Sequence, residues 1–441
     1  MIAFILAGGK GTRFKEITKD VLPKPMVNIA GKPILQHQIE FLARNNINKV
    51  IISVGYKAEI IKDYFKEGKQ FDVSIIYSEE SEPLGTAGAF KYAESLINRE
   101  REGDILVIYG DIIFDIDLER MLNFHKCHNG LGTLFVHPND HPYDSDLLEV
   151  NQGDRVIKFI NNPHSKELIY QNLVNAGLYI LRSEILQYIP YKQKLDFGRD
   201  IFSKIIDTKK YLYAYNSPEY VKDIGTPDRY NKVKDDILNG KVHRRNLKNK
   251  QKVVFLDRDG VINKEVDLLY KPEQLKLISG VEKAIKQLNN SDYLVVITTN
   301  QPVVARGLCT EEDIREIHKM LETLLSRQGA YIDRIYYCPH HPEKGYPEEN
   351  KKYKIKCNCR KPEIGMFLQA EKDLNILKEE SFMIGDTTTD IQTGKNYGIR
   401  TILVKTGYKG LDKKFSVKPD YIFQNLKKAV NFLLHEYVPN L

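Results

Sequence analysis

The sequence lacks any apolar run that approaches the roughly 20 residues needed to span a bilayer. It also lacks internal repeats, low-complexity tracts and coiled-coil heptads. Cysteine is scarce, with five residues in 441, and three of the five fall between Cys338 and Cys359. This clustering argues against a disulfide framework and favours a metal site in a reducing compartment. We therefore expect a cytoplasmic protein that does not enter membranes.

The chain opens on the apolar run Ile2–Leu6, which has no basic leader and leads into glycines, so we expect a core strand and not a signal peptide. A hydrophobic content of 42% and a charged content of 28% are typical of globular proteins, and the length predicts two or three domains. The formal net charge of +7 suits anionic ligands. Because the Lys and Arg residues are scattered and not striped, we expect small phosphorylated ligands and no nucleic acid. A homo-oligomer is compatible with the sequence.

A glycine-rich turn, Ala7-Gly-Gly-Lys-Gly-Thr-Arg13, follows the first expected strand. Glycine lets the backbone approach phosphate oxygens closely, although such turns also occur without a ligand. The spacing fits neither the P-loop nor the dinucleotide fingerprint. Lys24 lies between two prolines that restrict the backbone and can aim its ammonium group. The candidate phosphate-binding residues are Gly8, Gly9, Gly11, Thr12, Arg13 and Lys24.

These motifs, followed by Gly31-Lys-Pro33, resemble those of the nucleotidyltransferases that make nucleotide sugars, and the resemblance covers residues 1 to 240. It implies that a sugar 1-phosphate attacks the α-phosphorus of a nucleoside triphosphate and that pyrophosphate leaves. Catalysis would then consist of alignment and charge neutralisation. The implied site residues are Gly85 and Thr86 for base and ribose, Asn175 for the sugar, Asp111 and Asp223 for Mg²⁺, Arg13 for the departing pyrophosphate and Lys24 for the group under attack.

One position departs from that family. After the strand expected around Val156 to Phe159, the family carries Glu-Lys-Pro, whose lysine contacts the sugar phosphate, whereas this chain has Asn161-Asn162-Pro163. A neutral amide cannot replace that charge. Another cation, Lys158 for example, has to substitute, or the sugar phosphate is bound differently.

Strand and helix signals alternate in both halves of the chain. Before Asp111, apolar strands at Val50–Val54 and Val73–Ile76 alternate with helical patterns, which predicts a parallel doubly wound sheet. The polar, basic stretch 241–251 follows a helix-stop signal and predicts a solvated linker. We therefore expect an α/β protein with two doubly wound domains, residues 1–240 and 252–441, joined by a linker at 241–251.

Two carboxylates follow an apolar run in the second half. Lys252–Leu256 predicts a buried parallel strand, and Asp257 and Asp259 stand at its carboxyl end. Two acids at this spacing also occur in ordinary polar turns. Placed at a sheet edge, they can converge on a cation and a phosphate, one as nucleophile and the other as proton donor.

With three later motifs, this stretch resembles the haloacid-dehalogenase-like phosphatases. The later motifs are Tyr293–Gln301, Cys359–Pro362 and Phe382–Asp390. The resemblance implies an aspartyl phosphate on Asp257, with Asp259 first protonating the leaving oxygen and then activating water. The other implied site residues are Thr299, Asn300, Gln301, Arg360 and Lys361, with Mg²⁺ held by Asp257, Asp386 and the backbone carbonyl of Asp259.

Three thiols and two imidazoles lie between the second and third of these motifs. Cys338, His340, Cys357 and Cys359 make a ligand set of the closed tetrahedral Zn²⁺ type, although unrelated cysteines in one loop would give the same pattern. The pattern resembles a zinc-bearing branch that includes the D,D-heptose 1,7-bisphosphate 7-phosphatases and the histidinol-phosphate phosphatases. By resemblance to the heptose enzymes, Asp267 and Tyr270 of this chain would belong to the substrate loop.

The two halves fit consecutive steps of one pathway, because a bisphosphate phosphatase yields the sugar 1-phosphate that a nucleotidyltransferase consumes. We expect removal of the 7-phosphate of D-glycero-D-manno-heptose 1,7-bisphosphate, then GMP transfer from GTP, for surface glycans. The guanine assignment follows from family analogy alone. Two alternatives stay open: a phosphatase for histidinol phosphate or another small phosphoester, and a first half that senses nucleotide sugars without catalysis.

Overall fold

The computed structural model describes residues 1–9, 21–99, 103–165, 167–208, 210–343, 345 and 348–438. The chain divides into two compact units. Unit 1 comprises Met1–His137, Tyr143–His164 and Leu173–Asn246, and unit 2 comprises Pro138–Pro142, Ser165–Asn172 and Leu247–Leu441. None of the helices in the described ranges has the length and apolar character needed to cross a membrane.

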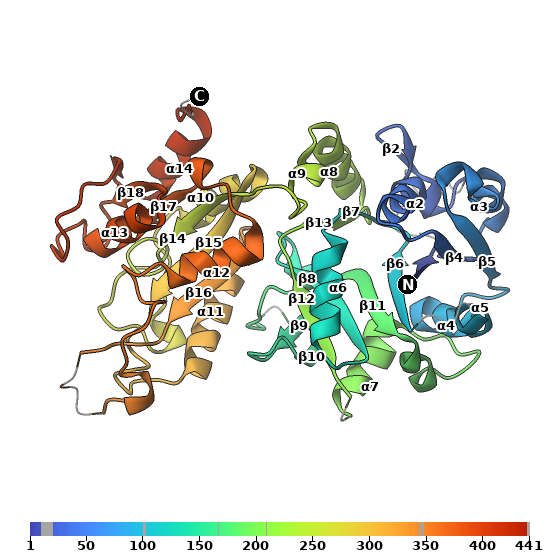
Figure 1. Ribbon diagram of the computed structural model, residues 1–441, viewed down its shortest axis with the longest axis horizontal. Helices are drawn as coiled ribbons and strands as arrows, with labels where there is room; N and C mark the ends of the chain where they lie inside the picture. The colour runs from blue at the N-terminus through green and yellow to red at the C-terminus, as the bar shows by residue number, and fades with distance from the viewer. Residues whose placement is uncertain are drawn as a thin grey trace. The chain divides into compact units, whose positions relative to one another are not determined.

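Unit 1 is built on one large mixed sheet with helices on both faces (Figure 1). Its strands are β1 (Ile2–Leu6), β2 (Asn28–Ile29), β3 (Lys32–Pro33), β4 (Lys49–Val54), β5 (Ser74–Glu79), β6 (Asp104–Tyr109), β7 (Ile112–Asp115), β8 (Gly132–His137), β9 (Leu147–Val150), β10 (Val156–Ile160), β11 (Val174–Arg182), β12 (Leu212–Asn216) and β13 (Tyr220–Asp223). Its helices are α2 (Ile34–Arg44), α3 (Ala58–Phe65), α4 (Gly85–Tyr92), α5 (Glu94–Arg99), α6 (Leu118–Cys127), α7 (Ser203–Ile206), α8 (Pro227–Leu238) and α9 (Lys241–Arg244).

The parallel part of this sheet confirms the predicted alternation. β1 pairs in parallel with β4 and β6, and β4 pairs in parallel with β5. Alternate β1 residues face opposite sides: Ala3 and Ile5 pack in the core with α2 and α3, whereas Phe4 packs in the core with α4. The sheet then continues with β11 and β8 in antiparallel pairing, an extension that hydrophobic periodicity alone does not orient. β7 and β13 form a separate antiparallel pair.

The stretch 241–251 contains ordered structure. It begins with α9, and Arg245 and Asn246 after this helix are buried. The Asn246 amide donates a hydrogen bond to Asp115 at 2.8 Å. Leu247, at the start of the third stretch of unit 2, is also buried. The stretch 241–251, although polar in composition, therefore contains residues that pack against the rest of the protein.

Unit 2 is a six-stranded, fully parallel sheet in the order β16-β15-β14-β17-β18-β19. Its strands are β14 (Lys252–Leu256), β15 (Tyr293–Asn300), β16 (Arg334–Cys338), β17 (Phe382–Gly385), β18 (Arg400–Val404) and β19 (Tyr421–Phe423). Its helices are α10 (Val281–Asn290), α11 (Glu311–Ser326), α12 (Gly365–Leu374), α13 (Thr388–Tyr397) and α14 (Leu426–His435).

The β14 strand lies at the centre of this sheet and is buried on both faces. Val254 and Leu256 pack in the core that holds α10, α11 and α14, and Phe255 packs in the core that holds α12. Figure 1 shows α12 across the sheet, where Phe367 lies 4.3 Å from Phe255 between ring centroids. Burial of each such side chain contributes about 1.5–3 kcal/mol. The residues that follow β14 are therefore held on a rigid base.

Candidate active sites

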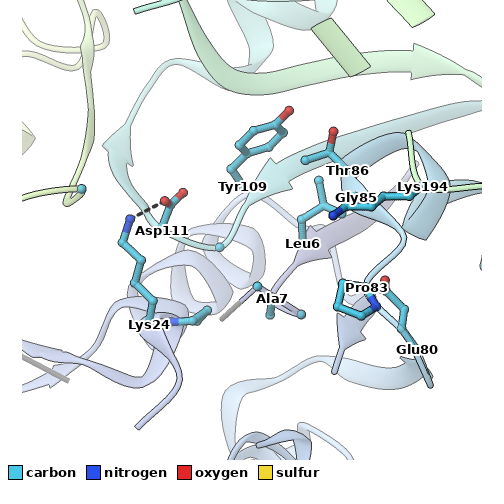
Figure 2. A pocket seen from close by; sticks show the side chains of 15 residues that line it. Leu6, Ala7, Lys24, Glu80, Pro83, Gly85, Thr86, Tyr109, Asp111 and Lys194 are labelled. Atoms are coloured by element: carbon cyan, nitrogen blue, oxygen red, sulfur yellow. Dashed lines mark hydrogen bonds and ion pairs between the residues drawn. The ribbon is translucent and has the colours of Figure 1, made fainter. Parts of the chain in front are cut away.

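A pocket of about 360 Å³ opens in unit 1 at the carboxyl ends of β1 and β6. This is the edge where parallel α/β sheets bind ligands. Figure 2 shows two sides of the pocket, with Lys24 and Asp111 on one and Gly85, Thr86 and Lys194 on the other. The residues that line it are Leu6, Ala7, Gly8, Gly9, Lys24, Pro25, Glu80, Pro83, Gly85, Thr86, Tyr109, Gly110, Asp111, Lys194 and Gly225.

Lys24 and Asp111 meet in this pocket. The Lys24 ammonium lies 2.5 Å from Asp111 Oδ2, and Asp111 stands in the turn between β6 and β7. Gly110 is tightly packed, because a Cβ there would lie 2.6 Å from the carbonyl oxygen of Leu6. A larger residue at this position would push the acid away from β1.

Asp223, at the end of β13, is held by an arginine that the sequence motifs did not indicate. Arg229 NH1 lies 3.1 Å from both carboxylate oxygens, and the Gly225 amide donates to Oδ2 at 2.9 Å. Burial raises the pKa of Asp223, but the charges of Arg229 and Lys24 and these hydrogen bonds lower it by more. The Ile224 amide donates to the Asp111 carbonyl at 3.1 Å, so the backbone brings the two expected metal ligands to one place.

Glu80 is a further pocket residue that sequence reasoning missed. Its carboxylate accepts from the Ser53 hydroxyl at 2.5 Å and from the Leu84 amide at 2.9 Å. These two donors, on β4 and just before α4, fix the plane of the carboxylate. A carboxylate repels phosphate, so an acid in this pocket indicates that another part of the ligand donates hydrogen bonds to it.

The other residues predicted for unit 1 fall into three groups. Gly8, Gly9, Gly85 and Thr86 line the pocket, and Thr86 also donates to Asp196 at 2.9 Å. Asn175 lies on β11, and its side-chain oxygen is buried with no hydrogen-bond partner among the residues described. Lys10, Gly11, Thr12 and Arg13 lie outside the described residues.

Three carboxylates converge in unit 2. Asp257 follows β14, Asp386 follows β17, and Asp390 lies in the first turn of α13. One oxygen from each can be chosen so that all lie within 4.8 Å of one another. Lys361 joins them, with its ammonium 3.0 Å from Asp257 and 2.5 Å from Asp390. The sequence motif contained Asp390 but did not assign it to the site.

The electrostatics of this cluster favour a bound cation. Burial, together with the charges of Asp390 and Asp257, raises the pKa of Asp386 to about 9. Burial likewise raises the pKa of Asp257 to about 7 against the opposing charge of Lys361. Asp386 Oδ1 is buried without a hydrogen-bond partner within the described ranges. A divalent cation would relieve the repulsion and use the unpaired oxygen, so these residues fit Mg²⁺.

Two glycines shape the space around Asp386. Gly260 and Gly407 have positive φ values of +77° and +58°, and a Cβ at either would lie 2.4 or 2.1 Å from Asp386 Oδ2. The same oxygen accepts from the Tyr408 amide at 2.6 Å. Only glycine lets both backbone segments close around this carboxylate oxygen.

Asp259 is embedded in a hydrogen-bonded group. Arg258, with no exposed surface, lies 2.9 Å from Asp259 Oδ2, and the amides of Asn263 and Gln301 donate at 2.8 and 3.0 Å. Burial raises the pKa of Asp259, but the Arg258 charge and these hydrogen bonds lower it by more. The complete burial of Arg258 could not be predicted from the sequence, since an arginine after a strand is usually exposed.

The remaining residues predicted for unit 2 lie in different places. Gln301 donates to the Thr299 hydroxyl at 2.9 Å, and Asn300 exchanges two hydrogen bonds with the Lys361 backbone. Asp267 lines a cavity of about 580 Å³, whereas Tyr270 packs against the hydrophobic core of unit 2. The described residues that line the cavity are Lys264, Glu265, Asp267, Ile278, Thr406, Gly407 and Tyr408.

The predicted zinc ligands come together in unit 2. The thiols of Cys338, Cys357 and Cys359 are free and lie 3.2–3.6 Å apart, and His340 Nδ1 lies 3.4 Å from Cys359 Sγ. Three sulfurs bound to one Zn²⁺ at about 2.3 Å would lie about 3.8 Å apart, so the arrangement fits this ion. The hydrogen-bond contact between Cys359 and Cys338 is the main cause that lowers the pKa of Cys359 to about 5. His341 stays outside the group of ligand atoms.

Comparison with known proteins identifies the first half. A family model described as nucleotidyl transferase matches residues 2–240. The chain belongs to this nucleotidyl transferase family. Within the family, mannose-1-phosphate guanyltransferase 2 of Candida glabrata is 34% identical over 230 residues, which are 52% of this chain and 62% of that protein. The chain thus spans less than two thirds of that relative.

The second half of this nucleotidyl transferase family member matches a different group. A model described as HAD-hydrolase-like matches residues 358–429. The D-glycero-beta-D-manno-heptose-1,7-bisphosphate 7-phosphatase of Haemophilus ducreyi is 39% identical over 185 residues, 42% of this chain and 98% of that protein. Among solved structures, HddC from Yersinia pseudotuberculosis, complexed with GMP-PN, is 27% identical, with 53% of this chain and 98% of that chain covered and a TM-score of 0.46. The resemblances read from the motifs, a nucleotidyltransferase fused to a haloacid-dehalogenase-like phosphatase, are confirmed.

Proposed function

We propose that the chain removes the 7-phosphate from D-glycero-D-manno-heptose 1,7-bisphosphate and then transfers GMP from GTP to the heptose 1-phosphate, with release of pyrophosphate. The relatives support this, because one acts by name on the bisphosphate and another is a guanyltransferase for a related sugar 1-phosphate. The product of the first reaction is a substrate of the second. A nucleoside triphosphate substrate and free thiols suit the cytoplasm.

The convergence of Asp257, Asp386 and Lys361 carries the phosphatase proposal. A carboxylate and a phosphate repel each other, so attack by Asp257 needs neighbouring positive charge. Lys361, 3.0 Å from Asp257, supplies one charge. Mg²⁺, held by Asp257, Asp386 and the Asp259 carbonyl, would screen the phosphate further, and Asp390 is a fourth candidate ligand in the same group.

The proposed reaction proceeds through a covalent intermediate. A carboxylate oxygen of Asp257 forms a bond to phosphorus, and the bond from phosphorus to the sugar oxygen breaks. Water then attacks the aspartyl phosphate, its proton passes to Asp259, and Asp257 is regenerated with release of phosphate. The contacts of Asp259 favour its ionised form, which suits this second step. Donating a proton to the sugar oxygen in the first step requires that Asp259 first take one up against those contacts.

In the nucleotidyltransferase proposal, the reacting phosphates bind on the Lys24 and Asp111 side of the pocket in Figure 2, and the base and ribose bind on the opposite side. Asp111 and Asp223 would hold Mg²⁺, which neutralises charge on the reacting phosphates. Lys24, 2.5 Å from Asp111, would then stabilise the group under attack. We assign the departing pyrophosphate to Arg13, and the base and ribose to the Gly85 and Thr86 side.

Glu80 supports guanine as the base. Guanine presents two neighbouring donors on one edge, the ring N1–H and the exocyclic amino group, and a carboxylate accepts both. Uracil and thymine present one N–H between two carbonyl oxygens, which a carboxylate would repel. Ser53 and Leu84 fix the Glu80 carboxylate, and its remaining lone pairs can accept the two guanine donors.

We assign a structural role to Zn²⁺ at the cysteine cluster. Cys359 directly precedes Arg360 and Lys361, and Arg360 donates to the His340 carbonyl at 3.0 Å. A metal that binds Cys359 and His340 would fix the path of the chain into the phosphatase site. Arg360 would then contact and recognise the substrate, and Lys361 would balance the charge of Asp257.

An Asp257→Asn variant tests whether two independent sites exist. The amide is not a nucleophile, so phosphate release from heptose 1,7-bisphosphate should disappear. Pyrophosphate release from GTP and heptose 1-phosphate should match the unsubstituted chain, since the change lies in unit 2. Loss of both activities would contradict separate sites, and retained phosphate release would exclude Asp257 as the nucleophile. Mass analysis of the nucleotide product with each nucleoside triphosphate identifies the base.

A further inference from the structure

The acidic side of the unit 1 pocket has to accept a sugar 1-phosphate, which carries up to two negative charges. Among the described residues that line the pocket, the cations are Lys24 and Lys194. Lys24 is bound to Asp111. Lys194 stands beside Gly85 and Thr86 in Figure 2, on the side away from Asp111. The described lining therefore offers little positive charge for a second anion near the two acids.

Arg229 places a further cation beside the pocket, where it is paired with Asp223 and Asp144. It lies in the first turn of α8, and its side chain is 23% exposed. A Cβ built on Gly225, a pocket residue, would lie 3.5 Å from Arg229 NH1. The guanidinium therefore borders the pocket next to Asp223, with one edge on that carboxylate.

The other edge of the guanidinium contacts Asp144, a residue that Asn162 also contacts. Arg229 NH2 lies 2.6 Å from Asp144 Oδ2, and Asn162 Nδ2 donates to the Asp144 carbonyl at 3.0 Å. Asn162 is the neutral, exposed residue at the position where the sequence comparison led us to expect a lysine. Arg229 and residue 162 thus approach the same residue, Asp144, from two elements.

We propose that Arg229 binds the phosphate of the sugar 1-phosphate and replaces the charge that Asn162 cannot provide. A guanidinium presents paired N–H groups that match two oxygens of one phosphate, and it stays charged at every relevant pH. The proposal rests on the proposed nucleotidyltransferase function. A purely structural Arg229, which only ties Asp144 to Asp223, would show the same ion pairs in the absence of ligand, so the two roles have to be separated by ligand dependence.

The test compares Arg229→Gln, Arg229→Lys and the double variant Arg229→Gln with Asn162→Lys. With D-mannose 1-phosphate or heptose 1-phosphate as varied substrate, Arg229→Gln should raise the KM for the sugar phosphate about 10- to 100-fold. The KM for GTP should change much less. Arg229→Lys should lie between, and a lysine at 162 should recover a large part of the loss. Calorimetric titration of the sugar 1-phosphate in the absence of GTP should show the same order of affinities.

The phosphatase rate of each variant provides an internal control for folding and concentration. An unchanged KM for the sugar phosphate in Arg229→Gln overturns the inference, and so does an equal rise of both KM values without rescue by lysine 162. If the unsubstituted chain neither binds the sugar 1-phosphates nor releases pyrophosphate with them, the proposed function itself fails and Arg229 loses its ligand. If the unsubstituted chain does convert the sugar 1-phosphates, then Arg229 variants that do not show the expected changes contradict only the role of Arg229, and the proposed nucleotidyltransferase function stands.

Discussion

Replacing Glu80 by Gln should weaken the preference for GTP. In the unsubstituted chain, two guanine donors would meet a carboxylate that Ser53 and Leu84 hold in place. The variant can keep the Leu84 contact through its carbonyl, and the Ser53 hydroxyl can turn to accept from its NH₂ group. That NH₂ group then faces a guanine donor, and the negative charge is gone.

The magnitude follows from the hydrogen bond that is lost. A hydrogen bond to a charged group contributes about 1.5–3 kcal/mol, so kcat/KM for GTP should fall roughly 10- to 150-fold. UTP should gain, because an amide can accept from the ring N–H and donate to the neighbouring carbonyl oxygen. ITP, which lacks the exocyclic amino group, should be a poorer substrate than GTP for the unsubstituted chain, but the two should be nearly equal for Glu80→Gln.

Pyrophosphate release with GTP, ITP and UTP measures these ratios at a fixed sugar 1-phosphate concentration. Glu82→Gln is the matched control, because Glu82 is exposed and does not line the pocket, and it should leave all three values unchanged. An undiminished preference of Glu80→Gln for GTP over ITP would refute the reasoning. Equal losses with all three nucleotides would instead point to damage of the pocket.

Two further substitutions test the metal sites. Gly407→Ala should lower phosphate release about 100-fold, because the added Cβ would lie 2.1 Å from Asp386 Oδ2 and displace that carboxylate. Gly398 is the control, because it also has a positive φ, of +85°, but a Cβ there meets no atom within 4 Å. Equal losses of activity in Gly407→Ala and Gly398→Ala would contradict displacement of Asp386 as the cause. Cys357→Ser should remove zinc from a chain that otherwise holds about one ion, as measured by elemental analysis, and should reduce phosphate release. Cys309→Ser, which changes a free thiol outside the cluster, should do neither, and full zinc content in Cys357→Ser would exclude the assigned ligand set.

The sequence predicted the parts of the fold that depend on local patterns. The limits of β1 and β14 agree with the apolar runs at Ile2–Leu6 and Lys252–Leu256, since a buried strand needs continuous apolar residues. The acids at the carboxyl ends of these sheets could be placed for the same reason. The antiparallel pairing of β11 could not, because strand direction depends on distant partners.

The residues missed by the sequence share a different property. Arg258, Asp390, Glu80 and Arg229 each take their position from a partner far along the chain or from burial on a neighbouring element. An isolated charged residue in a turn has no such partner visible in the sequence, and exposure is its commonest state. Motif resemblance supplied the expected site residues, and the packed structure was needed for those that hold them in place.

The backbone at Asp257 has one more consequence. The Asp257 amide donates to the Ile384 carbonyl at 3.0 Å, so the proposed nucleophile is tied to the neighbouring strand that leads to Asp386. Neither acid can approach a substrate by bending its own chain without breaking the ladder between them. In the proposed reaction, the phosphorus atom would have to approach a fixed oxygen. Adjustment to sugars of different size would then fall to the chain segments that line the cavity around Asp267 and Tyr408.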